Sequence, residues 1–158
     1  MSIDTDDFRA LLGRFASGVT VVTTVDSRGH DYGMTVSAFS SVSLEPPLVL
    51  VCIAKDASVY EAFEGAPTMV INILAEGQEA LSRRFAGPIW DRFAGVGYAR
   101  AENGSAILSD VLAWLEATIV SRHDAGDHLI LVAQPERGQV DEHRPLLYYR
   151  GGYARLER

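Results

Sequence analysis

The sequence predicts a mainly β protein, an antiparallel closed barrel with a few short helices. Apolar and β-branched runs of strand length recur along the chain, short turns join most of them, and helical spacing is confined to a few connections. Closing such a sheet into a barrel removes its exposed edges. The 158 residues and the 47% hydrophobic content predict a single domain over residues 1–158 with one substantial core.

The first half of the chain is expected to hold one helix and three strands. Apolar residues recur at helical spacing behind the caps at residues 4–6, and Gly18 ends this helix: Phe8, Leu11, Leu12 and Phe15. Residues 19–26 are rich in β-branched side chains, and a turn at 26–29 leads into a strand at 32–39. Two prolines then precede an apolar run at residues 48–53, which predicts a strand buried on both faces.

The second half is expected to add two helices and about three strands. A helix at 56–63 closes at Gly65 and Pro67, and the remaining elements follow in order: a strand at 68–74, a helix at 76–85, a long structured loop at 86–108, two strands around the turn at 124–127, and the apolar stretch 145–156. A long structured loop of this kind needs something to cover.

Composition narrows the function classes. The formal charge is −7 and no block of Lys and Arg is present, which argues against a nucleic-acid partner. No apolar run approaches the roughly 20 residues that cross a bilayer, and the acidic N-terminus is unlike a signal peptide, so we expect a cytoplasmic protein without a membrane partner. With one cysteine, Cys52, and no clustered histidines, neither an internal disulfide nor a metal site is expected, and an inert core thiol is favoured over a nucleophile.

Five hydroxyl side chains stand within nine residues of the predicted second strand and its continuation: Thr35, Ser37, Ser40, Ser41 and Ser43. In one interpretation they form the solvent-facing side of a half-buried strand. In the other, the hydroxyls and nearby backbone N–H groups bind a phosphate or the polar edge of a ring, because they offer donors at little steric cost. Spacing alone leaves both open.

Two other positions carry a similar choice. Arg83 and Arg84 end a predicted helix, either as solvated charges or as phosphate ligands, and at most one of these neighbours is expected to point inward. His128 directly precedes an apolar strand, where its imidazole is either a structural hydrogen-bonding group or a ligand contact at a strand mouth. Motifs of the Rossmann, P-loop, nucleophile-elbow and zinc-protease kinds are missing, as are paired carboxylates.

Taken together, five stretches resemble the flavin reductase-like family, the short-chain NAD(P)H:flavin oxidoreductases. In the family's order they are "FASGVTVVTT", "GMTVSAFSSVSLEPPLVLVCI", "MVINIL" with "LSRRFAG", "DRFAGV", and "GDHLILVAQ" with "PLLYYRGGY". The resemblance implies an FMN-binding split β-barrel with a few short helices, usually a homodimer with the flavin near the subunit interface. It also implies hydride transfer from NADH or NADPH to FMN or FAD, with reduced flavin supplied to a partner monooxygenase.

The resemblance also implies site residues. The wall along the flavin ring would be Met34, Thr35, Val36, Ser37, Ala38, Ser40 and Ser41, with Cys52, Ile53, Ala54, Lys55 and Ser58 beside it. The phosphate end would be enclosed by Ser82, Arg83, Arg84 and Phe85, and the nicotinamide side bordered by His128, Tyr148, Arg150 and Tyr153. The two cofactors carry the reactive atoms, so no acid–base pair is required, and His128 would orient the nicotinamide in the catalytic site.

Two alternatives and one residue remain open. Ala133, Gln134 and Pro135 depart from the family's pattern after His128, which leaves room for a flavin-binding carrier or redox sensor without reductase turnover. A split-barrel oxidase of pyridoxal-type phosphates would need more basic residues than this chain contains. Trp90 is expected to cover the flavin, cover the dimer seam, or pack within the chain.

Overall fold

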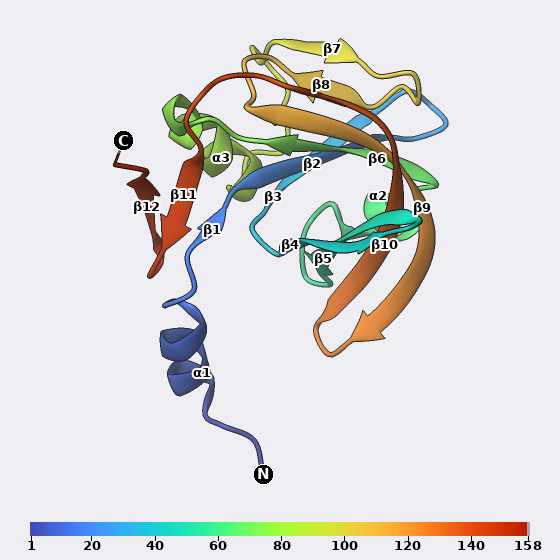
Figure 1. Ribbon diagram of the computed structural model, residues 1–158. Coiled ribbons are helices and arrows are strands. Elements are labelled where there is room, and N and C mark those ends of the chain that lie inside the picture. The colour runs from blue at the N-terminus through green and yellow to red at the C-terminus, as the bar shows by residue number, and fades with distance from the viewer. Residues whose placement is uncertain (158) are drawn as a thin grey trace.

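The computed structural model describes residues 1–157 and is built around a seven-stranded antiparallel sheet with the order β3-β2-β6-β9-β10-β5-β4. The bounds of these strands are β2 Thr20–Val25, β3 Asp31–Val36, β4 Phe39–Leu44, β5 Pro47–Ala54, β6 Thr68–Ile73, β9 Ala113–Ala125 and β10 His128–Val140. The two edge strands, β3 and β4, are consecutive in the chain and are separated only by Ser37 and Ala38. The sheet therefore has to curl until its edges meet at this corner, as Figure 1 shows.

The mainly β fold with a few short helices is confirmed, and the barrel is split, because no ladder joins β3 to β4 within residues 1–157. The corner is held instead by the backbone N–H of Cys52, which donates to the carbonyl of Ala38 at 3.0 Å. Each edge strand thus has one row of backbone groups outside the sheet's ladder.

Two smaller sheets lie outside the barrel (Figure 1). One has the order β1-β11-β12, formed by Ser17–Gly18, Leu146–Tyr149 and Gly152–Arg155, and the other pairs β7 Tyr98–Arg100 with β8 Ala106–Leu108. The prediction of a loop over residues 86–108 is therefore wrong for its second part, where two three-residue strands form a hairpin. Strands this short leave almost no periodic signal in a sequence.

Three α-helices and one short 3₁₀ helix occur in the described residues: α1 Thr5–Leu12, α2 Tyr60–Glu64, η1 Glu76–Gln78 and α3 Glu79–Ala86. None of them is long and apolar enough to span a membrane. The side chain of Asp4 caps α1 by accepting from the N–H of Asp6 at 2.8 Å. The helix expected at 56–63 is shorter than predicted, because residues 56–59 form tight turns before α2 begins.

The core has two parts. The barrel interior holds the larger cluster, which includes Val51, Ile53, Met69, Ile71 and Leu131. The smaller cluster lies where α3 and β11 cover the outside of the sheet, and it includes Val21, Leu74, Phe85, Leu108 and Leu146. Both clusters draw on alternate residues of the strands, as the two-residue period of a strand requires.

The prediction that residues 48–53 are buried on both faces is wrong. In β5, Val49, Val51 and Ile53 point into the barrel and are buried, whereas Leu50 and Cys52 on the other face are half-buried. A barrel strand has only one face in the core, so a continuous apolar run leaves an apolar outer face. Strand β10 continues through Pro135 to Val140 with a register shift between Pro135 and Arg137.

Candidate functional site

A groove follows the outer face of β3, where α3 and the turn after β5 approach that strand. One part is a cavity of about 490 Å³ lined by Met34, Thr35, Asp56, Ala57, Ser58, Phe85, Ala86, Gly87, Pro88 and Arg92. The next part, about 190 Å³, is lined by Val19, Thr35, Ser37, Ser82, Ala86, Tyr148 and Tyr153. Because Thr35 and Ala86 line both, we treat the two parts as one site, the β3 groove.

Close packing of α3 against β3 depends on Gly33. A methyl group at Gly33 would lie 2.7 Å from Cε1 of Phe85, closer than two carbon atoms can pack. The Phe85 ring is fully buried and meets Phe93 edge to face, with 5.1 Å between ring centroids. Glycine at position 33 therefore lets helix α3 lie directly on the strand and form one wall of the groove.

Hydroxyl groups connect the elements that line the narrower part. Thr35 Oγ1 donates to the carbonyl of Ser82 at 2.6 Å, and Ser82 Oγ lies 2.7 Å from the phenol oxygen of Tyr153. Tyr153 in turn meets Tyr148 edge to face at 5.4 Å. The strand, the helix and the C-terminal hairpin are thus tied together at a wall that presents polar edges beside aromatic rings.

The five predicted hydroxyls separate into two groups. Thr35 and Ser37 line the β3 groove, whereas Ser40 and Ser41 are exposed on β4 and Ser43 is half-buried there. Ser40 Oγ donates to the carbonyl of Ser41 at 2.9 Å. Ligand contact by Ser40 or Ser41 stays a prediction.

Neither of the predicted arginines lines the β3 groove. Arg83 is paired with Glu79 at 3.4 Å and lies over the Tyr153 ring, 4.9 Å from its centroid. Arg84 donates to the backbone carbonyls of Arg92, Asp91 and Ala94 at 2.6, 2.9 and 2.9 Å. Both line a separate hollow of about 530 Å³, which shares Gly87 and Pro88 with the main cavity of the groove. A phosphate role for either one stays a prediction.

Arg92 is a groove residue that the sequence reasoning missed. Its Nη1 donates to the carbonyl of Gly33 at 2.7 Å, and its Nη2 donates to the carbonyl of Gly87 at 3.0 Å. Burial lowers the pKa of this guanidinium from its ordinary value. It lies within "DRFAGV", one of the five stretches on which the family resemblance depends, and membership of that stretch is the one signal that could have indicated it.

His128 and Lys55 meet at the mouth of the barrel, next to the turn that carries Ser58. His128 pairs in register with Ala54, and its Nδ1 lies 2.7 Å from Asp127 Oδ1, a hydrogen bond that lowers the pKa of Asp127. Lys55 Nζ is 3.0 Å from Asp124 Oδ1. The half-exposed imidazole thus has one nitrogen engaged, as the structural interpretation requires, while its other nitrogen remains for a ligand.

Several predicted residues contribute backbone rather than side chain to this region. Val36 and Ile53 are buried with their side chains in the barrel core. The backbone of Ala38 holds the barrel corner, and Arg150 has a left-handed φ of 52° in the turn between β11 and β12, where its N–H donates to Gly13. Cys52 is half-buried rather than fully buried, and burial raises the pKa of its thiol, which favours an unreactive thiol over a nucleophile.

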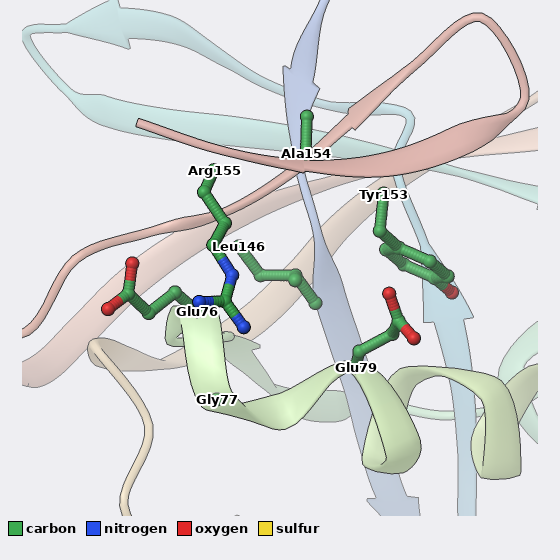
Figure 2. Close-up of a pocket in the computed structure, with 7 residues that line it drawn as sticks. All are labelled: Glu76, Gly77, Glu79, Leu146, Tyr153, Ala154 and Arg155. Atoms are coloured by element: carbon green, nitrogen blue, oxygen red, sulfur yellow. The ribbon is translucent and has the colours of Figure 1, made fainter. Parts of the chain in front are cut away.

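A smaller hollow also has Tyr153 in its lining. It measures about 180 Å³, and Figure 2 shows the side chains that line it: Glu76, Glu79, Leu146, Tyr153 and Arg155, with Gly77 and Ala154. Sites for small molecules and cofactors usually measure about 300–1,000 Å³, so the β3 groove has the size for a tricyclic ring and this hollow does not. Within residues 1–157 no group of three or more His, Cys, Asp or Glu side chains is placed to hold a metal ion.

The β3 groove suits a cofactor that brings its own chemistry. Its lining holds one carboxylate, one guanidinium and two phenols, together with hydroxyl and backbone groups. No nucleophile–base pair is present among these described residues. Such a wall can hold a planar heterocycle between apolar contacts and hydrogen-bond donors, and it can position a second ring against the first.

Comparisons with known proteins agree with this arrangement. The family model described as "Flavin reductase like domain" matches residues 12–157. A protein of Rhizobium meliloti (strain 1021) named "Probable flavin reductase" is 43% identical over 156 residues, covering 97% of this chain and 50% of its own length. The flavin-dependent monooxygenase, reductase subunit HsaB, of Rhodococcus jostii (strain RHA1) is 39% identical over 99% of this chain and 80% of its own.

A solved structure provides the same comparison in three dimensions. The NADH:FAD oxidoreductase SgcE6 of Streptomyces globisporus, in complex with NAD and FAD fragments, superimposes with a TM-score of 0.91 at 33% identity. The alignment covers 99% of this chain and 97% of that one. The chain thus spans half the length of one curated relative and nearly all of this solved protein.

Proposed function

We propose that this chain, which belongs to the flavin reductase-like domain family, is an NAD(P)H:flavin oxidoreductase that uses FMN or FAD. The observation that carries the proposal is the β3 groove, because all the residues that line it lie within the matched residues 12–157. The resemblance expected from the five sequence stretches is confirmed by that match.

The residues present fit a flavin. The main cavity of about 490 Å³ adjoins the narrower part at Thr35 and Ala86, which gives a ring and its side chain one continuous path. As an edge strand, β3 offers backbone groups outside the ladder to the polar edge of the ring. Met34 and Thr35 would lie along the ring, and Ser37 near its pyrimidine edge. When both are bound, the nicotinamide supplies a hydride and the flavin accepts it.

The protein's own residues would position the two cofactors and stabilise the reduced flavin. Backbone N–H donors near residues 34–38 would stabilise the negative charge that develops on the ring when it is reduced. Tyr148 and Tyr153 close the narrower end of the groove, and the hydrogen bond between Ser82 and Tyr153 fixes the ring of Tyr153. His128, held by Asp127, would orient the nicotinamide from the barrel mouth.

An anaerobic absorbance measurement tests this function. Purified protein is mixed with FMN or FAD, and NADH or NADPH is added without oxygen while the visible flavin band is followed. We expect bleaching at a rate far above that of the same mixture without protein. If neither nucleotide bleaches either flavin, the chain is not a flavin reductase.

We also propose that the reduced flavin serves a partner monooxygenase. The similarity to the reductase subunit HsaB supports this, since that relative's name places it beside a flavin-dependent monooxygenase. The carrier or redox-sensor alternative depended on the altered stretch after His128. Because β10 continues through Gln134 and Pro135 as a strand, this stretch gives the alternative no support.

Association into a homodimer completes the proposal. The outer faces of β5 and β10 carry half-exposed apolar side chains that lie beside one another in register, Cys52 opposite Ile130 and Leu50 opposite Val132. An apolar sheet face of this kind on a single chain is typical of an interaction surface. A second copy of the chain would cover it near the barrel mouth, where Lys55 and His128 lie. The cytoplasmic location expected from the sequence stays a prediction.

A further inference from the structure

Three arginines lie around the β3 groove, and their contacts give them different roles. Arg83 lies over the Tyr153 ring and is paired with the carboxylate of Glu79. Arg84 uses three donated hydrogen bonds to hold the backbone of residues 91–94, and it lines the separate hollow of about 530 Å³. Of the three, Arg92 is the one that lines the main cavity of the groove.

The hydrogen bonds of Arg92 leave capacity for a ligand. Its Nε donates to Ile89 at 3.3 Å and its Nη1 to Gly33 at 2.7 Å. Its Nη2 donates to Gly87 at 3.0 Å and, over a long 3.4 Å, to the hydroxyl of Ser58. A guanidinium has five N–H groups, so within residues 1–157 one Nη1 hydrogen is unpaired and the Nη2 hydrogen directed at Ser58 is weakly held.

Ser58 adds a donor in the same corner. Its hydroxyl accepts from Arg92, so its own hydrogen points elsewhere and is available to an acceptor in the cavity. Arg92 and Ser58 both line the main cavity with Met34 and Thr35, so one unpaired and one weakly held guanidinium hydrogen and one hydroxyl hydrogen belong to the same corner. This is the donor pattern that phosphate oxygens prefer, because bonds to a charged donor are roughly twice as strong as neutral ones.

Arg92 also changes the charge at the end of α3. Carbonyl groups at a helix C-terminus carry partial negative charge and repel anions. Here the carbonyl of Gly87, directly after α3, accepts from Arg92 Nη2, which places a positive charge at the helix end. The other ionisable group that lines the main cavity is the carboxylate of Asp56, so an anion in this corner depends on the guanidinium.

We propose that Arg92 and Ser58 form the phosphate-recognition corner of the β3 groove, and that Arg92 determines the preference for flavin nucleotides over riboflavin. This inference rests on the proposed function, because it assumes that a flavin occupies the groove. It places on Arg92 the role that the sequence suggested for Arg83 or Arg84. Arg84 is then a positioning residue, since it holds the loop from which Arg92 extends.

The test compares the affinities of FMN and riboflavin, measured by quenching of flavin fluorescence without nicotinamide nucleotide. In the unchanged protein we expect FMN to bind more tightly. Arg92→Ala should lower the affinity for FMN by about tenfold or more and that for riboflavin by less than about twofold. Arg92→Lys should recover part of the loss, because it keeps the charge but not the fork of donors. The ratio of the two affinities is unaffected by any fraction of misfolded protein.

Arg84→Ala is the matched control. Because Arg92 extends from this loop, loosening residues 91–94 should weaken the binding of both ligands and lower the ratio of the two affinities by less than Arg92→Ala does. An unchanged ratio in Arg92→Ala, a changed ratio in Arg84→Ala alone, or an unchanged protein without preference for FMN would overturn the inference. Protein that prefers FMN but never passes electrons to it from NADH or NADPH would instead contradict the proposed reductase activity and leave the phosphate corner standing.

Discussion

At the scale of single residues, Gly33 is where strand, helix and loop meet. Its missing side chain admits the ring of Phe85, and its carbonyl accepts from Arg92. Phe93 lies within 3.3 Å of the same absent methyl group. One backbone position therefore supports the helix wall of the groove and holds the guanidinium proposed to recognise phosphate.

Gly33→Ala tests this convergence. The added methyl group cannot be accommodated without moving the buried Phe85 ring, and overpacking of this kind usually costs about 1–3 kcal/mol in unfolding free energy. We expect that loss in urea unfolding, together with weaker binding of both FMN and riboflavin. Gly18→Ala is the control, because a methyl group there meets nothing within 4 Å. Equal stability of the two variants would show that α3 does not depend on close approach to β3.

Cys52 gives a pH-dependent prediction. Burial raises the pKa of its thiol, so the thiolate is disfavoured in the folded chain. Alkylation by iodoacetamide should be slower for the native than for the urea-unfolded protein at pH 8–9, and the gap should narrow at higher pH. Because this thiol binds its proton more tightly when folded, its contribution to stability is present below the unfolded pKa and is lost as the pH rises through the folded one. Equal rates across this range would identify a reactive cysteine.

At this scale the structure brings together residues that the sequence named for the site. The hollow of the narrower part is lined by Thr35, Ser37, Ser82, Tyr148 and Tyr153, which span 118 positions, and the binding roles that the family resemblance implies for them stay predictions. Arg92 was missed, and the detailed roles of Arg83 and Arg84 were not readable, because the direction of a side chain depends on contacts with distant segments. Hydrogen bonds from Arg92 to Gly33 cross 59 positions of sequence and leave no local pattern.

At the scale of elements, the β7–β8 hairpin and its turn are fastened to the barrel by charge. Arg100 forms a bidentate pair with Asp31 on β3, at 2.5 and 2.8 Å. On the other side, the buried carboxylate of Glu116 on β9 accepts from the N–H of Asn103 at 2.5 Å and from Arg137 at 2.6 Å. A carboxylate that is only 2% exposed has to be satisfied in this way.

Glu116→Gln tests the importance of the buried carboxylate that accepts from Asn103 and Arg137. Replacing the charged acceptor weakens both bonds, and we expect a loss of about 1.5–3 kcal/mol in unfolding free energy. The control is Glu102→Gln, which removes the other carboxylate that pairs with Arg137, at 2.9 Å. Because Glu102 is largely exposed, that change should cost well under about 1 kcal/mol. A similar loss in both variants would mean that the burial of Glu116 has no special importance.

Elements with strong periodicity were predictable and the short ones were not. The strands at 20–25, 68–73 and around the turn at 126–127 agree with the expected runs, since β-branched residues and turn signals mark them locally. The strand at 17–18 depends on pairing with residues 147–148, and the hairpin strands at 98–100 and 106–108 are too short to leave a periodic pattern. Trp90, one of the open questions, is 94% exposed and so does not pack within the chain. That Trp90 covers the flavin or the dimer seam stays a prediction.

At the scale of the whole molecule, apolar surface is left uncovered in several places, and two of them bear on the proposed dimer. The outer face of β5 and β10 is one of them, and helix α1 is the other, since Phe8, Leu11 and Leu12 are all more than half exposed. In Figure 1, α1 extends away from the barrel. Stable protein interfaces bury roughly 1,200–2,000 Å² in total, and a sheet face together with a projecting helix could supply such an area.

Leu50→Asp tests the proposed dimer. A carboxylate in the middle of the apolar sheet face should separate the copies, because it would be buried without a partner at the interface. Light scattering coupled to size exclusion should give a mass near 34 kDa for the unchanged protein, twice the 17.2 kDa of one chain, and the single-chain mass for the variant. Val140→Asp, at a position 80% exposed near the far end of β10, should keep the larger mass. A monomeric unchanged protein would contradict the dimer.

The most direct test of the account is the crystal structure of this protein with FMN. We predict that the ring lies along residues 34–37 of the β3 groove, with its phosphate beside Arg92 and Ser58. A flavin bound in the separate hollow beside Arg83 and Arg84, or elsewhere outside the groove, would contradict the assignment of the site.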